Sequence, residues 1–181
     1  MCNLASACSL CGVVRQSPLS GVPEYPSHAL QTMPPLTFTR VNYAKLNSRQ
    51  QENYNFARVS ALLSEYGFTT LRLSVDWQGA DFIATHISGA PFLKVQLKSR
   101  LWVDTKYKGK EIWLCFPHKG TWYLYPHDDL LAWALANTGI GRTQGWKDPN
   151  DLSRVQGAYS WPGVPSKVAH WLAPFAIPPA L

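Results

Sequence analysis

Two strand-like segments of the chain carry side chains whose types and spacing suit a divalent metal ion. Asp81 lies in the first segment, and Gln96 and Lys98 lie two positions apart in the second, on one face of the strand. Residues 88–91 join the segments, and their composition (Ser, Gly, Ala, Pro) is typical of a short turn. A hairpin centred between the second and third of these residues places Lys98 opposite Asp81 and Gln96 diagonal to it. Diagonal neighbours on one face are about 7–8 Å apart at the backbone, within side-chain reach of a shared ion.

A carboxylate, an amide oxygen and an ammonium group at one place on a sheet suit metal-assisted hydrolysis of a phosphodiester. Mg²⁺ takes oxygen ligands from one or two carboxylates, water and substrate phosphate, so Asp81 and Gln96 are the expected ligands of Mg²⁺ or Mn²⁺. The ion polarises the phosphate and lowers the pKa of a bound water. Lys98 is expected to orient that water or to balance the charge that builds up on the phosphoryl oxygens.

A helix before the first strand is expected to bring a further carboxylate to this place. Ser48 followed three residues later by Gln51 is a capping-box pattern, and apolar residues recur at helical spacing from Phe56 to Tyr66. Four residues further back, the same stripe reaches Glu52. Glu52 is therefore expected on the face that packs against the sheet, where it could bind the metal directly or through water.

The segments after this helix predict a sheet. Five of them have the alternation or the apolar composition of strands: residues 68–75, 80–87, 92–100, 111–116 and 122–125. In the first, Leu71, Leu73 and Val75 are expected to face the core. His127-Asp128-Asp129 is expected to cap a short helix that ends near Leu135, and a second short helix is expected at residues 167–172.

The order of a helix with Glu52, then Gly79-Ala80-Asp81, then Gln96-Leu97-Lys98 resembles the PD-(D/E)xK nuclease superfamily over about residues 45–126. That superfamily includes restriction endonucleases and Holliday junction resolvases. The resemblance implies a mixed α/β (α+β) fold: a restriction-endonuclease-like core of a helix, a three-strand meander, further strands and a short helix. It also implies a divalent metal, cleavage of DNA or RNA, and an enzyme that often works as a homodimer.

Carried over residue by residue, Asp81 matches the metal-binding aspartate, Lys98 the catalytic lysine and Glu52 the acidic residue of the first helix. Gln96 departs from the pattern, because most members carry an acidic residue there. An amide oxygen still binds a hard cation, but one negative charge is missing. The resemblance therefore implies an Mg²⁺-dependent endonuclease that acts on DNA, or a binding module of the same fold that has lost catalysis.

A basic stretch next to these residues favours a polyanionic partner. Residues 92–110 contain six Lys or Arg against one Asp, within a chain of net charge +6. Aromatic residues interleave with them, as in proteins that stack nucleic-acid bases. Apart from Lys98, the expected nucleic-acid contacts are Lys94, Arg100, Lys106, Lys108, Lys110, Trp102 and Tyr107.

Composition changes along the chain predict three parts. Residues 1–40, rich in Ser, Pro and Cys, predict a flexible leader; residues 41–136 predict the nuclease-like domain, and residues 137–181 an extension packed on it. No apolar run has the length of a membrane helix and no secretory signal is evident, so a cytoplasmic protein is expected. Trp146, Trp161 and Trp171 leave a third function open, a protein-interaction subunit of a defence or repair assembly.

Overall fold

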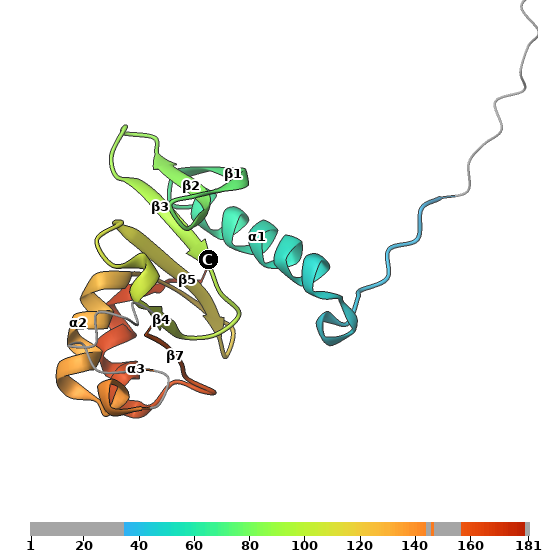
Figure 1. Ribbon diagram of the computed structural model, residues 1–181. Helices are drawn as coiled ribbons and strands as arrows, with labels where there is room; N and C mark the ends of the chain where they lie inside the picture. The colour runs from blue at the N-terminus through green and yellow to red at the C-terminus, as the bar shows by residue number, and fades with distance from the viewer. Residues whose placement is uncertain (1–34, 144–145, 147–156, 180–181) are drawn as a thin grey trace, which may run out of the picture. The chain divides into compact units, whose positions relative to one another are not determined.

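The computed structural model of the protein describes residues 35–143, 146 and 157–179 (Figure 1). The chain divides into two units, Met1–Arg40 and Val41–Leu181, and the second contains all the elements below. Most of the leader expected at residues 1–40 lies outside the described residues. None of the described helices is long and apolar enough to cross a membrane.

The second unit contains the expected helices and the five expected strands in the expected order, together with further strands and short 3₁₀ helices that were not expected. In chain order, the elements are η1 (Tyr43–Lys45), α1 (Ser48–Ser64), β1 (Phe68–Trp77), β2 (Ala80–His86), β3 (Phe92–Leu97), β4 (Trp102–Asp104), η2 (Thr105–Tyr107), β5 (Ile112–His118), β6 (Thr121–Pro126), α2 (His127–Asn137), η3 (Ile140–Arg142), β7 (Ala158–Ser160), α3 (Ser166–Leu172), η4 (Ala173–Phe175) and β8 (Ala176–Ile177). The helix, the three-strand meander and the short helix after two further strands were all expected.

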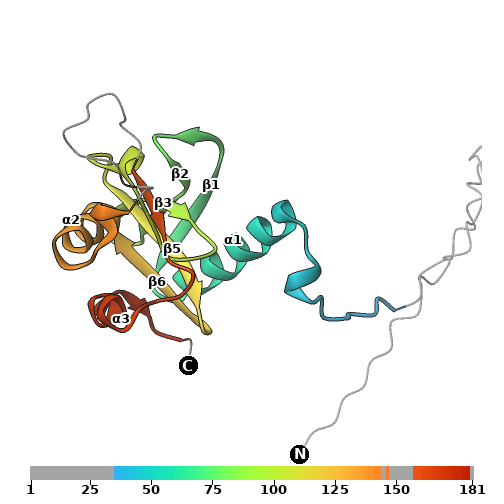
Figure 2. The same cartoon turned by 60° about the horizontal axis from the view of Figure 1, so that its bottom comes forward.

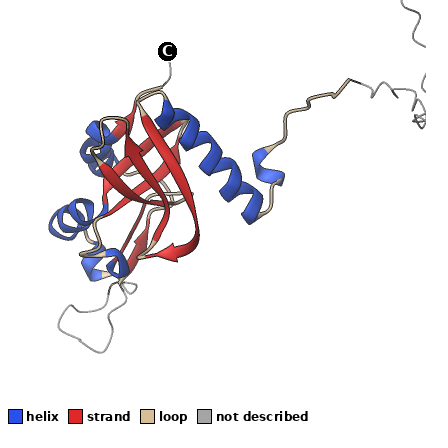
Figure 3. Ribbon diagram, turned by 90° about the horizontal axis from the view of Figure 1, so that it is seen from above, coloured by secondary structure: helices blue, strands red, loops and turns tan. Residues whose placement is uncertain are grey.

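The strands form a mixed sheet between layers of helices. Its order is β1-β2-β3-β5-β6-β8, with β3 and β5 parallel and the other neighbours antiparallel, while β4 and β7 form a separate pair. Figures 2 and 3 show α1 on one side of this sheet and α2 and α3 on the other. The fold is therefore the mixed α+β architecture that the sequence predicts.

Helix α1 packs its buried face on the middle of the sheet. Val59 and Leu63 meet Phe82 and Val95 in one apolar cluster, and burying such side chains stabilises the fold by about 1.5–3 kcal/mol each. The capping box lies one residue earlier than expected. Asn47, not Ser48, is the N-cap, and it exchanges hydrogen bonds with Gln50 in place of Gln51.

In strand β1, two of the three residues that were expected to face the core are exposed. Leu71 is 66% exposed and Val75 is 72% exposed, although Leu73 is partly buried. Thr70 and Arg72 face the helix instead, where the Thr70 hydroxyl bonds to the helix and the Arg72 guanidinium lies over a helix ring. The expectation failed for Leu71 and Val75 because α2 and α3 cover the β5–β6 part of the other face and leave the edge strand open.

The second core lies between β5, β6 and the C-terminal helices. Leu130 of α2 and Leu172 of α3 are fully buried there, and Trp146 and Trp161 are also buried. Helix α2 starts at His127 without a side-chain cap, so the capping expected of His127-Asp128-Asp129 is wrong. The Asp128 carboxylate instead binds the ring of His127 through Oδ1, at 2.7 Å, and the backbone N–H of Gly109 through Oδ2, at 2.8 Å.

The β2–β3 hairpin has a register two residues away from the one expected. Phe82 pairs with Val95 and Thr85 pairs with Phe92, so the turn is centred one residue earlier. Gly89 has a φ of +86° and donates its N–H to the carbonyl of residue 86, which lets the chain turn there. A shift of two residues leaves each side chain on its expected face, because the side-chain period of a strand is two.

Candidate active site

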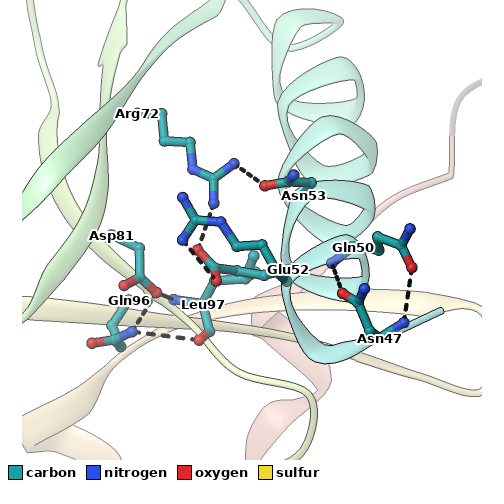
Figure 4. Close-up of polar contacts among 9 residues, drawn as sticks. Asn47, Gln50, Glu52, Asn53, Arg72, Asp81, Gln96 and Leu97 are labelled. Carbon is teal, nitrogen blue, oxygen red and sulfur yellow. Dashed lines mark hydrogen bonds and ion pairs between the residues drawn. The ribbon is translucent and has the colours of Figure 1, made fainter.

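Continued by one residue, the β2–β3 register puts Gln96 directly opposite Asp81, where Lys98 was expected. Carboxylate atom Oδ2 of Asp81 accepts hydrogen bonds from the amide Nε2 of Gln96 and from the backbone N–H of Leu97, the latter at 2.7 Å (Figure 4). The pair thus joins the start of one strand to the end of its neighbour. The convergence of Asp81 and Gln96 that the sequence indicated is present, although its register differs.

The surroundings of Asp81 disfavour the ionised form of its carboxyl group. Burial raises the pKa of this carboxyl, and the negative charge of Glu52 raises it further, whereas the Leu97 N–H, the Lys98 ammonium and the Gln96 amide each lower it. The net direction is upward. A bound cation would stabilise the ionised form, so cation binding and deprotonation of Asp81 favour each other.

Gln96 is held at both ends of its amide. Its nitrogen faces Asp81 and lies 3.4 Å from the carbonyl of Leu97, while its oxygen accepts a hydrogen bond from the Tyr107 hydroxyl at 3.0 Å. The amide oxygen therefore does not point at Asp81, contrary to the expectation for a metal ligand. A half-turn of the amide would exchange the two atoms without losing Tyr107, since a tyrosine hydroxyl accepts as well as donates.

Lys98 extends over two aromatic rings next to this pair. Its Nζ lies 5.5 Å from the centroid of the Tyr107 ring and 5.8 Å from that of Trp102, within the range of a cation–π contact. Burial lowers the pKa of the ammonium, and repulsion by Lys106 lowers it further, against the attraction of Asp81. Its backbone N–H donates to the carbonyl of Cys115 at 2.8 Å, which fixes the chain just after β3.

Glu52 lies near the pair but is engaged elsewhere. Its carboxylate is 2.5 Å from the guanidinium of Arg72 and 3.6 Å from that of Arg49. It lines a cleft of about 240 Å³ together with Leu97 and Lys98. The structure therefore brings Glu52 to the mouth of the site with its charge already paired to Arg72, a strand residue that the alternation of β1 turns toward α1.

The oxygen atoms at the site suit a hard cation better than a soft one. Among the described residues, no group of three His, Cys, Asp or Glu side chains could hold a metal. The oxygen ligands that come together are the Asp81 carboxylate, the Leu97 carbonyl and, after the half-turn, the Gln96 amide oxygen. Such a set fits Mg²⁺, which keeps several waters and binds substrate phosphate through few protein ligands.

Tyr107 has a different place from the one expected of it. Its side chain is only 2% exposed, so it offers no stacking surface to a base. Burial raises the pKa of its hydroxyl, and the negative charges of Asp104 and Asp81 raise it further, so it remains a donor for Gln96. No sequence pattern indicated this contact, because η2 reaches β3 only through the tertiary fold.

The other expected nucleic-acid contacts lie mostly at the surface. Arg100, Lys106, Lys108 and Lys110 are exposed, and Trp102 is half-buried. Lys94 is also half-buried and forms an ion pair with Glu111 at 3.3 Å. Four cationic side chains thus face solvent along the segment between β3 and β5, where a polyanion could meet them.

Comparisons with known proteins give little beyond this geometry. No protein-family model and no curated protein matches the sequence. Among solved structures, the chain is similar to Hjc, a Holliday junction resolvase from the archaeal hyperthermophile Archaeoglobus fulgidus. The identity is 13% and the TM-score 0.34, over 42% of this chain and 72% of that one. A likeness at this level carries no weight for function.

Proposed function

We propose that the chain is a metal-dependent nuclease that hydrolyses phosphodiester bonds of DNA and belongs to the PD-(D/E)xK superfamily. One observation carries the proposal: the Asp81 carboxylate bonds to the Gln96 amide at the ends of two paired strands, and the Lys98 ammonium lies over the ring of Tyr107, whose hydroxyl bonds to the same amide. Asp81 and the Leu97 carbonyl would hold the cation, with Gln96 after its half-turn. Mg²⁺ or Mn²⁺, when bound, supplies Lewis-acid polarisation of the scissile phosphate.

Lys98 acts next to the reacting phosphate in this proposal. Its ammonium lies over the rings of Tyr107 and Trp102 and is attracted by the Asp81 carboxylate, while burial lowers its pKa. It would hold the attacking water or neutralise the phosphoryl oxygens as the new P–O bond forms and the leaving P–O bond breaks. Glu52 would assist only after it is released from Arg72, and then through water.

Cleavage assays with a single variant test this proposal. Linear, single-stranded and four-way-junction DNA would be incubated with the full chain and with Lys98→Ala, with and without Mg²⁺ or Mn²⁺. We expect metal-dependent cleavage that falls at least 100-fold in Lys98→Ala, since such groups contribute a factor of about 10²–10³. Lys167→Ala, at an exposed position of α3, is the matched control and should cleave normally. Equal cleavage by Lys98→Ala would contradict the proposal.

A second function is favoured by the amide of Gln96. Because its nitrogen donates to Asp81, the site in this form already satisfies the carboxylate without a cation. A nucleic-acid-binding module without catalysis would show salt-dependent DNA binding that ignores Mg²⁺ and no cleavage of any substrate. The third function, a protein-interaction subunit, stays a prediction; of the tryptophans that suggested it, Trp146 and Trp161 are buried and Trp171 is partly buried against the core.

A further inference from the structure

An aromatic groove lies beside the candidate active site. It has a volume of about 480 Å³ and is formed where the tip of the β1–β2 hairpin comes close to the starts of β3 and β5. Its lining includes three aromatic residues and three polar ones, namely Trp77, Phe92, Trp113, Gln78, Lys94 and Glu111. The volume lies within the range of about 300–1,000 Å³ found for small-molecule sites.

The rings of this groove are open to a ligand. Trp77 is 44% exposed and Phe92 is 56% exposed, while Trp113 is half-buried and packs against the apolar cluster under α1. Within the part of the chain that the structure describes, none of these three rings pairs with another ring. Flat, exposed rings favour a flat apolar ligand, because stacking removes both surfaces from water.

The polar side chains of the groove narrow the class of ligand. The Nζ of Lys94 lies 3.3 Å from the Glu111 carboxylate and 3.4 Å from the side-chain oxygen of Gln78. The groove therefore offers one cation and two acceptors at the edge of an aromatic surface. A nucleotide fits this set, since the faces of its base stack, the exocyclic amino groups donate hydrogen bonds, and the phosphate is an anion.

Through Lys94, the groove reaches the strand face that carries the candidate active site. Lys94 is two residues before Gln96 on β3, so their side chains point the same way about 6.6 Å apart along the strand. A single nucleic-acid strand that passes Asp81 could therefore place a neighbouring base in the groove. A base within a duplex could not enter, because both its faces are already stacked on neighbours and its pairing edge is occupied.

We propose that the aromatic groove binds an unpaired nucleobase next to the scissile phosphate. The nuclease would then prefer DNA with a single-stranded nucleotide at the cleavage point, such as a flap, a gap or a branch. The inference rests on the proposed function only for where the strand is cut. Binding of single strands by the groove is measured separately from cleavage.

Binding of labelled oligonucleotides by the full chain tests the groove. The probes are a single strand of about 12 nucleotides, long enough to span one binding groove, and its duplex, in a chelator that prevents cleavage. Trp77→Ala and Phe92→Ala should each weaken single-strand binding by roughly 5- to 100-fold and leave duplex binding within about twofold, because stacking is lost only for unpaired bases. Leu71→Ala, an exposed apolar residue on β1 outside the groove, is the control and should bind both probes normally.

Two outcomes would overturn the groove. One is unchanged single-strand affinity in Trp77→Ala and Phe92→Ala; the other is an equal loss for both probes. Trp77→Phe keeps a ring and should retain most of the affinity, so a loss from Trp77→Ala alone is not a folding defect. If the chain never cleaves DNA but the ring variants lose single-strand binding, the binding role of the groove is supported and the proposed nuclease activity is rejected. If the chain cleaves DNA and the ring variants bind single strands normally, the nuclease activity is supported and the binding role of the groove is rejected.

Discussion

At the scale of single residues, the site depends on what the Gln96 amide presents to Asp81. The nitrogen now faces the carboxylate, and the Tyr107 hydroxyl holds the oxygen. Asp81 therefore has a hydrogen-bond donor opposite it, not a second acid. This arrangement stabilises the metal-free protein and reduces the charge available to a cation.

Gln96→Glu should separate these two effects. Without metal, two carboxylates would face each other, so their pKa values would rise and the melting temperature at pH 7 should fall by several degrees. Mg²⁺ should then bind at least tenfold more tightly than in the parent chain and restore the lost stability. Calorimetric titration with Mg²⁺ and thermal melts measure both quantities. Asn137→Asp adds a charge at the end of α2 and loses a hydrogen bond to the Trp133 carbonyl, so it should lower the melting temperature but leave Mg²⁺ affinity unchanged. Equal Mg²⁺ affinity in Gln96→Glu and the parent would contradict the site.

The pH dependence of cleavage should carry the signature of Lys98. Burial and the charge of Lys106 lower the pKa of its ammonium below 10.5, so the protonated form is lost at a lower pH than for a free lysine. Lys106→Gln removes the repulsion, which raises this pKa and should move the alkaline limb of the kcat/KM profile to higher pH. Exposed Lys108 provides the control variant, Lys108→Gln. An alkaline limb that stays in place in Lys106→Gln would show that Lys98 does not set it.

At the scale of elements, the site is held together by the contact of the β1–β2 hairpin with η2. Gly79 has a φ of +96°, and a Cβ atom there would lie 2.8 Å from the Tyr107 ring. The same ring lies beneath the ammonium groups of Lys98 and Lys106, and the Tyr107 hydroxyl bonds to Gln96. The close approach of a glycine to Tyr107 therefore positions both the amide of Gln96 and the ammonium of Lys98.

Gly79→Ala should therefore lower the free energy of unfolding by more than the strain of a positive φ alone. Gly109 is the matched control, because its φ is +73° but no atom lies within 4 Å of its added Cβ. Gly109→Ala should lower the free energy of unfolding by about 1 kcal/mol, the cost of a positive φ. Gly79→Ala should lower it by a further 1–3 kcal/mol or so and also reduce cleavage, because the ring must move. Urea unfolding measures both free energies. Equal losses in the two variants would mean that the hairpin tip moves away from Tyr107 at no cost in free energy, contrary to the prediction.

At the scale of the whole molecule, the basic segment between β3 and β5 lies next to the candidate site. Arg100, Lys106 and Lys108 are exposed, and the Lys106 ammonium lies 3.7 Å from the Asp104 carboxylate. These cations come directly after β3 in the chain, so a polyanion that binds them is expected to lie near the Asp81–Gln96 pair. Cationic residues on one surface raise affinity for DNA in a salt-dependent way.

Salt dependence should report how many of these cations touch phosphate. A variant with Arg100→Gln and Lys108→Gln removes two exposed charges. It should reduce the slope of log K against log [salt] for duplex DNA by about two, close to one for each lost phosphate contact. Lys119→Gln with Lys167→Gln removes the same charge elsewhere and should leave the slope unchanged. Fluorescence anisotropy over a range of salt concentrations measures it, and an unchanged slope in the first variant would place DNA on another surface.

The sequence by itself determined the helices α1, α2 and α3, the strands β1, β2, β3, β5 and β6, and most of the faces of their side chains, but not β4, β7 or β8. Alternation in β3 put Lys94, Gln96 and Lys98 on one face, and the helical repeat located α1, because both patterns are local and follow from fixed backbone periods. The same periods kept Asp81 and Gln96 on a shared face although the expected hairpin register was wrong by two residues, since a shift of two preserves every face.

Only the tertiary structure decided which groups touch. Leu71 and Val75 were misplaced, because the face of β1 that is buried depends on where α1, α2 and α3 pack, not on the alternation itself. The contact of Tyr107 with Gln96, the pairing of Glu52 with Arg72 and the aromatic groove all join segments that are distant in the chain. Local periodicity has no information about such contacts, because they arise only when the packed layers bring the segments together.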